Sequence, residues 1–169
     1  MKETSDVSEI VAILKTTALG LIGIDGKDGS GKSTLAKDLS EQLGYAHINL
    51  DDYLEKNRGQ FVEYVKYDQV KEAIGKAKEP VIIEGVCLLA VMEHLSDSPD
   101  ISIYVKRVAD YGMWYDKEDC DINEDIDEFI RRKNSGGCTI PPLIEEIIRY
   151  HNKYKPHKRA DLIYRRIDR

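Results

Sequence analysis

The chain has 169 residues, 41% of them hydrophobic and 33% charged, which excludes a disordered chain and leads us to expect a single domain over residues 1–169. A net charge of −6 argues against nucleic acid or an anionic membrane surface as a partner. No apolar run approaches the roughly 20 residues of a membrane span. Three cysteines without a C-x-x-C spacing, Cys87, Cys120 and Cys138, fit the reducing cytoplasm.

The hydrophobic pattern predicts strands that alternate with helices. In chain order we expect a helix over 5–15, a strand over 19–25, a helix over 32–43, a strand over 47–50, a helix over 69–78, a strand over 80–85, a short helix over 86–95, a strand over 101–105, a helix over 142–153 and a strand over 160–167. This alternation predicts an α/β fold, with a five-stranded, mainly parallel sheet and helices on both faces.

The segment GIDGKDGSGKST, residues 23–34, contains the pattern G-x-x-x-x-G-K-[ST] between a predicted strand and a predicted helix. Glycines let the backbone turn its N–H groups toward phosphate oxygens, and the helix adds the positive end of its dipole. Lys32 is expected to reach the β- and γ-phosphates of ATP, and the Ser33 hydroxyl to ligate Mg²⁺. The predicted nucleotide-binding residues are Gly26, Asp28, Gly29, Ser30, Gly31, Lys32, Ser33 and Thr34.

Carboxylates end two of the predicted strands, at the edge of the sheet where ligands bind. Glu84 is expected to hold Mg²⁺, and the alternative is a cap on the next element. Asp51 or Asp52 is placed to accept a proton from an attacking hydroxyl, and the alternative is a capping pair in a loop. A guanine-specific Asn-Lys-x-Asp is absent, since Asn152–Lys155 lacks the aspartate, which argues against a switch GTPase.

Four segments together resemble one branch of the P-loop kinases. They are IDGKDGSGKSTLAKDL, INLDDY, VIIEGV and the Ala-Asp pair before the last apolar run. In these segments the chain is similar to the uridine kinases and phosphoribulokinases. The resemblance implies a three-layer P-loop kinase fold with a small lid, and ATP and Mg²⁺ as cofactors.

The resemblance also implies roles for single residues. Asp51 would be the general base with Asp52 beside it, and Glu84 the strand-end carboxylate at Mg²⁺. Asp68 follows an aromatic residue, as does a family aspartate that binds hydroxyls of the acceptor; a plain helix N-cap is the alternative. Tyr53 stands where the family has phenylalanine and is a further candidate for substrate contact.

The family lid carries arginines that clamp the phosphates. Here the highly charged residues 106–140 form the candidate lid region, in which Arg131 and Arg132 are the candidate donors, with Arg107 as another. A solvated helix end is the alternative for the first two. A basic segment near the end of the sequence has three interpretations: contact with a phosphate, contact with an acidic partner, or a solvated surface. Its residues are Lys153, Lys155, Lys158, Arg159, Arg165, Arg166 and Arg169.

These residues predict transfer of the γ-phosphoryl group of ATP to a hydroxyl of a small molecule. By resemblance the acceptor is a nucleoside such as uridine. The alternatives are a kinase of a non-nucleoside metabolite and a nucleotide-binding regulatory module without transfer activity.

Overall fold

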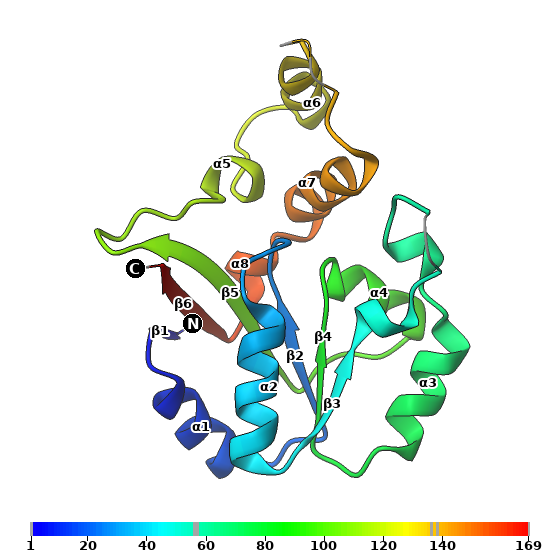
Figure 1. The fold of residues 1–169 in the computed structure, drawn as a ribbon, viewed down its shortest axis with the longest axis vertical. Coiled ribbons are helices and arrows are strands. Elements are labelled where there is room, and N and C mark those ends of the chain that lie inside the picture. The colour runs from blue at the N-terminus through cyan, green and yellow to red at the C-terminus, as the bar shows by residue number, and fades with distance from the viewer. Residues whose placement is uncertain (1, 56–57, 136, 138, 169) are drawn as a thin grey trace.

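Six parallel strands form one sheet in the computed structural model, which describes residues 2–55, 58–135, 137 and 139–168. The strand order is β1-β6-β5-β2-β4-β3 (Figure 1). The strands are β1 (Lys2–Thr4), β2 (Leu21–Asp25), β3 (Ala46–Asn49), β4 (Val81–Glu84), β5 (Ile101–Ala109) and β6 (Leu162–Asp168). The predicted parallel α/β sheet is therefore confirmed.

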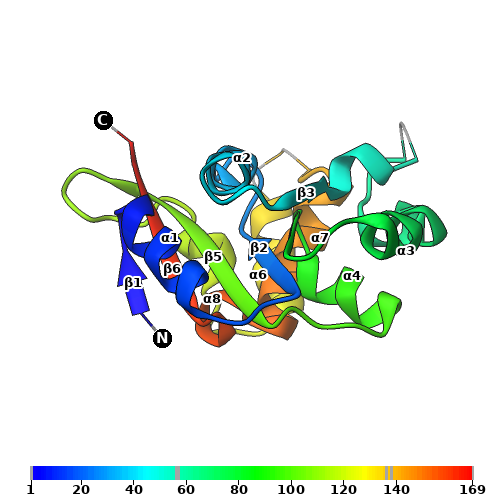
Figure 2. The same cartoon turned by 90° about the horizontal axis from the view of Figure 1, so that it is seen from below.

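Helices cover both faces of this sheet. They are α1 (Val7–Thr16), α2 (Lys32–Leu43), α3 (Tyr67–Lys76), α4 (Leu88–Leu95), α5 (Lys117–Cys120), α6 (Ile126–Asn134), α7 (Pro142–Tyr154) and α8 (Pro156–Arg159), with 3₁₀ turns η1 (Leu50–Tyr53) and η2 (Val62–Tyr64). In Figure 2, α2 and α8 lie on opposite sides of β5. None of the helices among the described residues has the length and apolar character that crossing a bilayer requires.

Two hydrophobic clusters fill the space between the sheet and the helices. On one face, Leu14 of α1 and Leu39 of α2 pack with Ile24 of β2. On the other face, Val91 of α4 and Ile147 of α7 pack with other residues of the sheet. Burial on both faces explains why all five residues of β2 are buried and why its sequence is an apolar run rather than an alternation.

The count of five strands is wrong, because β1 adds a sixth. Its sequence, Lys-Glu-Thr, has no apolar run, so no pattern marks it as a strand. It pairs with β6 through the backbone, from Lys2 opposite Leu162 to Thr4 opposite Tyr164. Such backbone pairing leaves no trace in the hydrophobic pattern.

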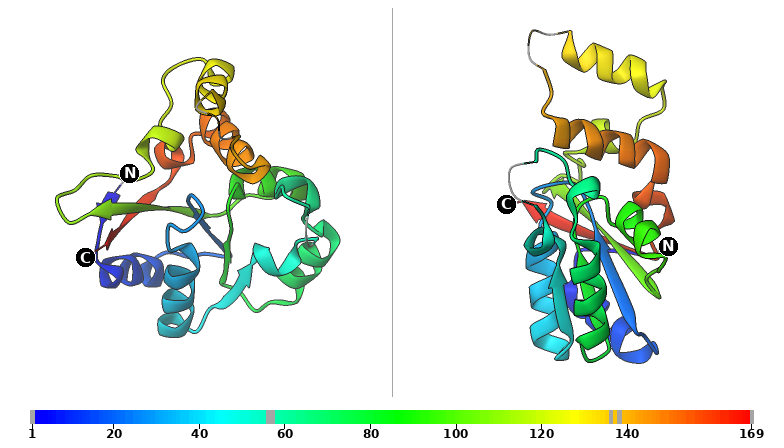
Figure 3. Two further views of the ribbon diagram at one scale, coloured as in Figure 1. Left: turned by 45° about the horizontal axis from the view of Figure 1, so that its top comes forward. Right: turned by 90° about the vertical axis from the view of Figure 1, so that its right-hand side faces the viewer.

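The region between β5 and α7 also differs in part from the expectation. The predicted strand 101–105 continues to Ala109, because β5 and β6 stay paired beyond the end of β2. Helices α5 and α6 follow, and Phe129 of α6 packs with Ile148 of α7 in a small separate cluster. Figure 3 shows α6 stacked on α7, beyond the end of the sheet. Of the cysteines, Cys87 and Cys120 are free and buried, and Cys138 lies outside the described residues.

Candidate active site

A cavity of about 340 Å³ lies where the second and third strands end, and we call it the phosphate cavity. Six residues of the predicted nucleotide-binding set line it: Asp28, Gly29, Gly31, Lys32, Ser33 and Thr34. Asp51 of η1 and Arg166 of β6 complete its polar wall, and Leu143 of α7 is part of its apolar wall. Residues far apart in the sequence thus meet around one space.

Residues 26–34, which we call the phosphate loop, owe their shape to two glycines. Gly31 has φ +99°, in the left-handed region, and precedes the first residue of α2. A Cβ on Gly26 would lie 2.8 Å from the Val105 carbonyl oxygen and 2.7 Å from Ser30 Oγ. Ser30 is buried and does not line the cavity.

Lys32, at the start of α2, is buried, with an exposed fraction of 7%. Its ammonium donates to the Lys27 carbonyl oxygen at 3.0 Å and lines the phosphate cavity. The first N–H groups of α2 have no partner inside the helix, so they and Lys32 together present positive charge at this end of the helix.

Asp51 enters the cavity from η1, where the Asn49 side chain caps the turn by accepting from the Asp51 N–H at 2.9 Å. Burial raises the pKa of Asp51, the nearby Glu84 carboxylate raises it further, and Lys32 opposes this. The charges of Glu84 and Lys32 therefore act on Asp51, although the three residues come from β4, α2 and η1. A carboxylate with a raised pKa is a stronger proton acceptor.

Glu84, the last residue of β4, is 1% exposed, and its Oε1 has no hydrogen-bond partner among the described residues. His47 Nε2 lies 3.6 Å from that oxygen. A buried carboxylate oxygen without a donor is costly unless a cation approaches it. In the described part of the chain no group of three His, Cys, Asp or Glu residues could hold a metal, but Mg²⁺ in phosphotransfer sites uses only one or two carboxylates together with phosphate and water. Glu84 and the Ser33 hydroxyl fit that requirement.

A second cavity, of about 580 Å³, adjoins the first and shares Asp51, Leu54, Phe61 and Leu143 with it. We call it the outer cavity. Among its other lining residues are Asp52, one of the predicted substrate residues, and Lys66. Asp51 therefore lies on the boundary between a space beside the phosphate loop and a more open polar space.

Other predicted substrate residues lie outside both cavities. Tyr53 is half-buried and packs against the hydrophobic core. Asp68 is exposed in the first turn of α3; the N-cap is Lys66, so the alternative of a plain cap at Asp68 is wrong. Arg131 and Arg132 are exposed in the last turn of α6, and Arg132 pairs with Glu124 at 2.6 Å.

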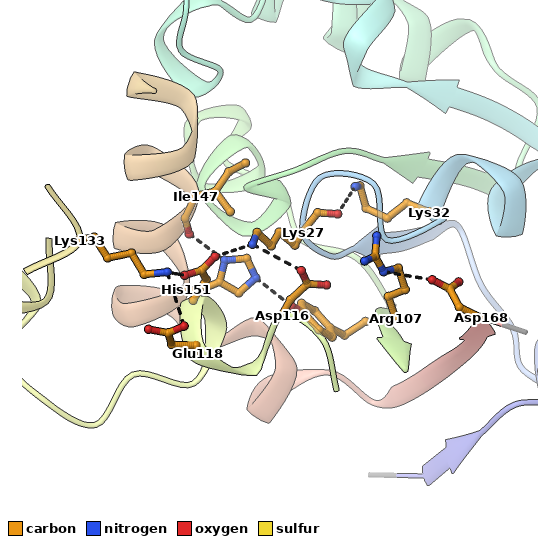
Figure 4. A network of polar contacts seen from close by, with 11 residues as sticks. Lys27, Lys32, Arg107, Asp116, Glu118, Lys133, Ile147, His151 and Asp168 are labelled. Carbon is orange, nitrogen blue, oxygen red and sulfur yellow. Dashed lines mark hydrogen bonds and ion pairs between the residues drawn. The ribbon is translucent and has the colours of Figure 1, made fainter. Parts of the chain in front are cut away.

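The candidate lid region touches the phosphate loop through a carboxylate instead of an arginine. Asp119 of α5 accepts from Lys27 of the loop at 2.5 Å and from Lys133 of α6. Asp116 lies 3.4 Å from the same Lys27 ammonium (Figure 4). Burial opposes ionisation of Asp119, but the hydrogen bonds from Lys133 and Lys27 hold its pKa below the usual value. The loop and α6 are thereby joined through one carboxylate.

Arg166 is the cavity residue that the motifs missed. Its Nη1 donates to the Gly29 carbonyl oxygen at 3.1 Å, and its Nη2 donates to Asp168 at 2.6 Å. Arg107, the residue opposite it on β5, lies 3.2 Å from Asp168 and stacks on Tyr115. The only signal in the sequence was the basic segment near its end, of which Arg169 lies outside the described residues.

Behind the loop, Asp25 ends β2 as a buried carboxyl that accepts from the Gly26 N–H and the Tyr150 hydroxyl. Burial raises the pKa of Asp25 to about 6, against these hydrogen bonds, from 3.8. The folded state holds this proton more tightly than the unfolded state. Protonation of Asp25 therefore adds about 3 kcal/mol to the free energy of unfolding below pH 4, and this contribution is lost as the pH rises through 6.

We expect Asp25→Asn to remove this pH dependence. Burial lowers the pKa of His151 to about 4, which acts in the opposite direction, so the quantity to compare is the difference between the two proteins. Urea unfolding at pH values from 4 to 7 measures it. If the difference in unfolding free energy between the two proteins stayed constant over this pH range, the raised pKa of Asp25 would be contradicted.

Known proteins resemble this chain in sequence. A family model described as shikimate kinase matches residues 28–81. A Thermococcus kodakarensis protein named "Putative adenylate kinase" is 42% identical over 60 residues, which are 33% of this chain and 34% of that protein. The chain thus matches only about a third of that relative's length. The uridine kinase of Clostridium perfringens is 26% identical, over 84% of this chain and 85% of that enzyme.

Solved structures resemble the fold over nearly its whole length. A "Possible Uridine Kinase" from Bacillus stearothermophilus superposes with a TM-score of 0.53 at 19% identity, over 94% of this chain and 96% of the other. A "putative fructose transport system kinase" from Silicibacter sp. TM1040 gives 0.50 at 14% identity, over 95% and 100%. In its phosphate loop, its parallel sheet and these likenesses, the chain is similar to P-loop small-molecule kinases, and uridine kinase-like proteins are among the proteins it resembles.

Proposed function

We propose that the protein transfers the γ-phosphoryl group of ATP to a hydroxyl of a small molecule. The observation that carries this proposal is the meeting of Lys32 and Asp51 in one cavity, with the Glu84 carboxylate close enough to raise the pKa of Asp51. A phosphate-binding cation, a proton acceptor and a buried carboxylate for Mg²⁺ are the parts that phosphoryl transfer requires.

Each part has one task. Lys32 and the N–H groups of the phosphate loop bind the phosphates and orient the γ-phosphorus. Ser33 and Glu84 would hold Mg²⁺, which neutralises phosphate charge when bound. The acceptor oxygen attacks the γ-phosphorus, the bond to the bridging oxygen of ADP breaks, and Asp51 accepts the hydroxyl proton.

For the acceptor we propose a nucleoside such as uridine, bound in the outer cavity. Likeness to a uridine kinase over most of both chains supports it. The family match described as shikimate kinase supports a non-nucleoside metabolite instead, and this stays the second candidate. The outer cavity places Asp52 and Lys66 near Asp51, and these groups suit a polyhydroxylated acceptor of either kind. The cytoplasmic location stays a prediction.

An acceptor screen tests the function. The protein is incubated with Mg·ATP and a panel of nucleosides, nucleotides, sugars and hydroxy acids, and products are identified by mass spectrometry. We expect a phosphorylated nucleoside that the Asp51→Asn variant does not form. A phosphorylated sugar or hydroxy acid would support the proposed kinase activity and would contradict a nucleoside as the acceptor.

One observation favours a nucleotide-binding module without transfer: neither arginine of α6 lines the phosphate cavity. If ATP binds tightly and no acceptor in the panel is phosphorylated, the nucleotide-binding module without transfer activity is preferred.

Glu84→Gln tests the metal role. The amide keeps the shape of the side chain and removes the charge, so we expect the Mg²⁺ concentration for half-maximal activity to rise by about 10-fold or more, on the scale of disturbed metal sites. Glu41→Gln, on the exposed side of α2, is the matched control. An unchanged Mg²⁺ dependence would remove Glu84 from the metal site.

A further inference from the structure

The described residues that line the phosphate cavity include two cations, Lys32 and Arg166. They come from different parts of the chain, since Lys32 begins α2 and Arg166 lies near the end of β6. The Arg166 side chain is 35% exposed, so its guanidinium faces the cavity without being sealed from it. A cation in this position is available to a ligand.

Neighbouring groups fix the orientation of this guanidinium. Nε and Nη2 of Arg166 both donate to Asp168 Oδ1, at 3.1 and 2.6 Å. The other oxygen, Oδ2, lies 3.2 Å from Nε of Arg107. One carboxylate is thus shared by two arginines, and the group of three carries a net charge of about +1. Asp168 orients the Arg166 guanidinium without neutralising both arginines.

Close packing connects Arg166 to the phosphate loop. A Cβ built on Gly31 would lie 2.6 Å from Arg166 Cδ, and Arg166 Nη1 donates to the Gly29 carbonyl oxygen at 3.1 Å. Glycine at position 31 therefore serves two purposes, because it permits φ +99° and leaves room for this arginine. The guanidinium lies directly beside the phosphate loop.

We infer that Arg166 binds the phosphate chain of the nucleotide, an inference that rests on the proposed function. The hydrogen bond from Nη1 to a neutral carbonyl oxygen is weaker than one to a phosphate oxygen, so an entering phosphate exchanges one acceptor for a better one. Arg131 and Arg132, the arginines predicted for this task, lie on α6 outside the cavity. β6 supplies the guanidinium in their place.

Nucleotide affinity tests this inference. The probes are Mg²⁺ with the non-hydrolysable ATP analogue AMP-PNP, and inorganic tripolyphosphate, which has no base or ribose; calorimetry gives both affinities. We expect Arg166→Met to weaken both by about 10-fold or more, the scale of one charge-assisted hydrogen bond. Arg165→Met is the matched control, because this neighbour on the same strand approaches Glu3 instead of the loop, and we expect it to leave both affinities unchanged.

Two further measurements separate phosphate binding from support of the loop. The affinity of the wild-type protein for AMP-PNP should fall more steeply with KCl than that of Arg166→Met, because salt screens the contact that the variant lacks. Arg166→Lys keeps the positive charge but loses the planar guanidinium with its paired N–H donors, so it should have an intermediate affinity. An equal salt dependence, or lysine and methionine variants of equal affinity, would overturn the inference.

The outcomes also separate this inference from the proposed function. If the wild-type protein bound neither probe, the proposed function itself would fail. If it bound both and Arg166→Met matched Arg165→Met, only the role of Arg166 would fail. A loss with AMP-PNP but not with tripolyphosphate would assign Arg166 to the base or ribose and would likewise overturn phosphate binding.

Discussion

The Lys32→Ala variant is expected to lose most of its nucleotide binding and at least about 10²-fold of its turnover, because the change removes the charge placed on the β- and γ-phosphates. The effect is large because Lys32 is buried within the phosphate loop, where its charge is poorly screened. Calorimetry with Mg²⁺ and AMP-PNP measures binding, and a coupled assay for ADP measures turnover.

Lys37→Ala is the control for this result. Lys37 lies in the same helix, is exposed, and approaches only Glu41 at 3.9 Å among the described residues, so its loss should change neither quantity. Melting temperatures of both variants establish that α2 is intact. If Lys32→Ala kept wild-type affinity and rate, the phosphate loop would not be the nucleotide site.

Asp51→Asn is expected to leave Mg·ATP binding largely intact and to reduce transfer by roughly 10²-fold or more, the usual scale for loss of a general base. The amide is nearly isosteric but accepts no proton. Because burial and then Glu84 raise the pKa of Asp51, the rate in the wild-type protein should rise with pH through a value above the ordinary 3.8. Single-turnover rates over a pH series measure both effects.

Asp52→Asn is the companion variant. Asp52 lines the outer cavity but not the phosphate cavity, so its loss should raise KM for the acceptor more than it lowers kcat. If Asp51→Asn transferred phosphate at the wild-type rate, or if its pH profile matched that of the wild-type protein, Asp51 would not be the base.

Local sequence was enough to place Lys32, Asp51 and Glu84 in the fold, and their roles stay predictions. Each lies at or after the end of a recognisable apolar run, and the carboxyl ends of parallel strands meet at one edge of a sheet. The parallel α/β sheet followed from the same runs and is confirmed.

Residues that depend on the pairing of distant strands or on lid packing could not be placed in this way. Arg166 reaches the cavity because β6 lies beside β5 and extends with it past the end of β2. Asp119 reaches Lys27 because α5 folds back onto the loop, across 92 positions of sequence. No periodicity encodes either contact, and Arg131 and Arg132 were predicted from the resemblance of their region to a family lid.

The short strand β1 has a consequence for the solubility of this fold. Long strands at the rim of a sheet expose unpaired backbone groups and invite a second chain to pair with them. Here the rims are the three residues of β1 and the four of β3, while the longer β5 lies inside. β1 covers β6 only from Leu162 to Tyr164. Three of the four residues of β6 beyond Tyr164 are charged, namely Arg165, Arg166 and Asp168, and the fourth is the exposed Ile167. Charge thus protects that stretch against intermolecular sheet growth, so the arginine that serves the nucleotide also helps to keep copies of the chain apart.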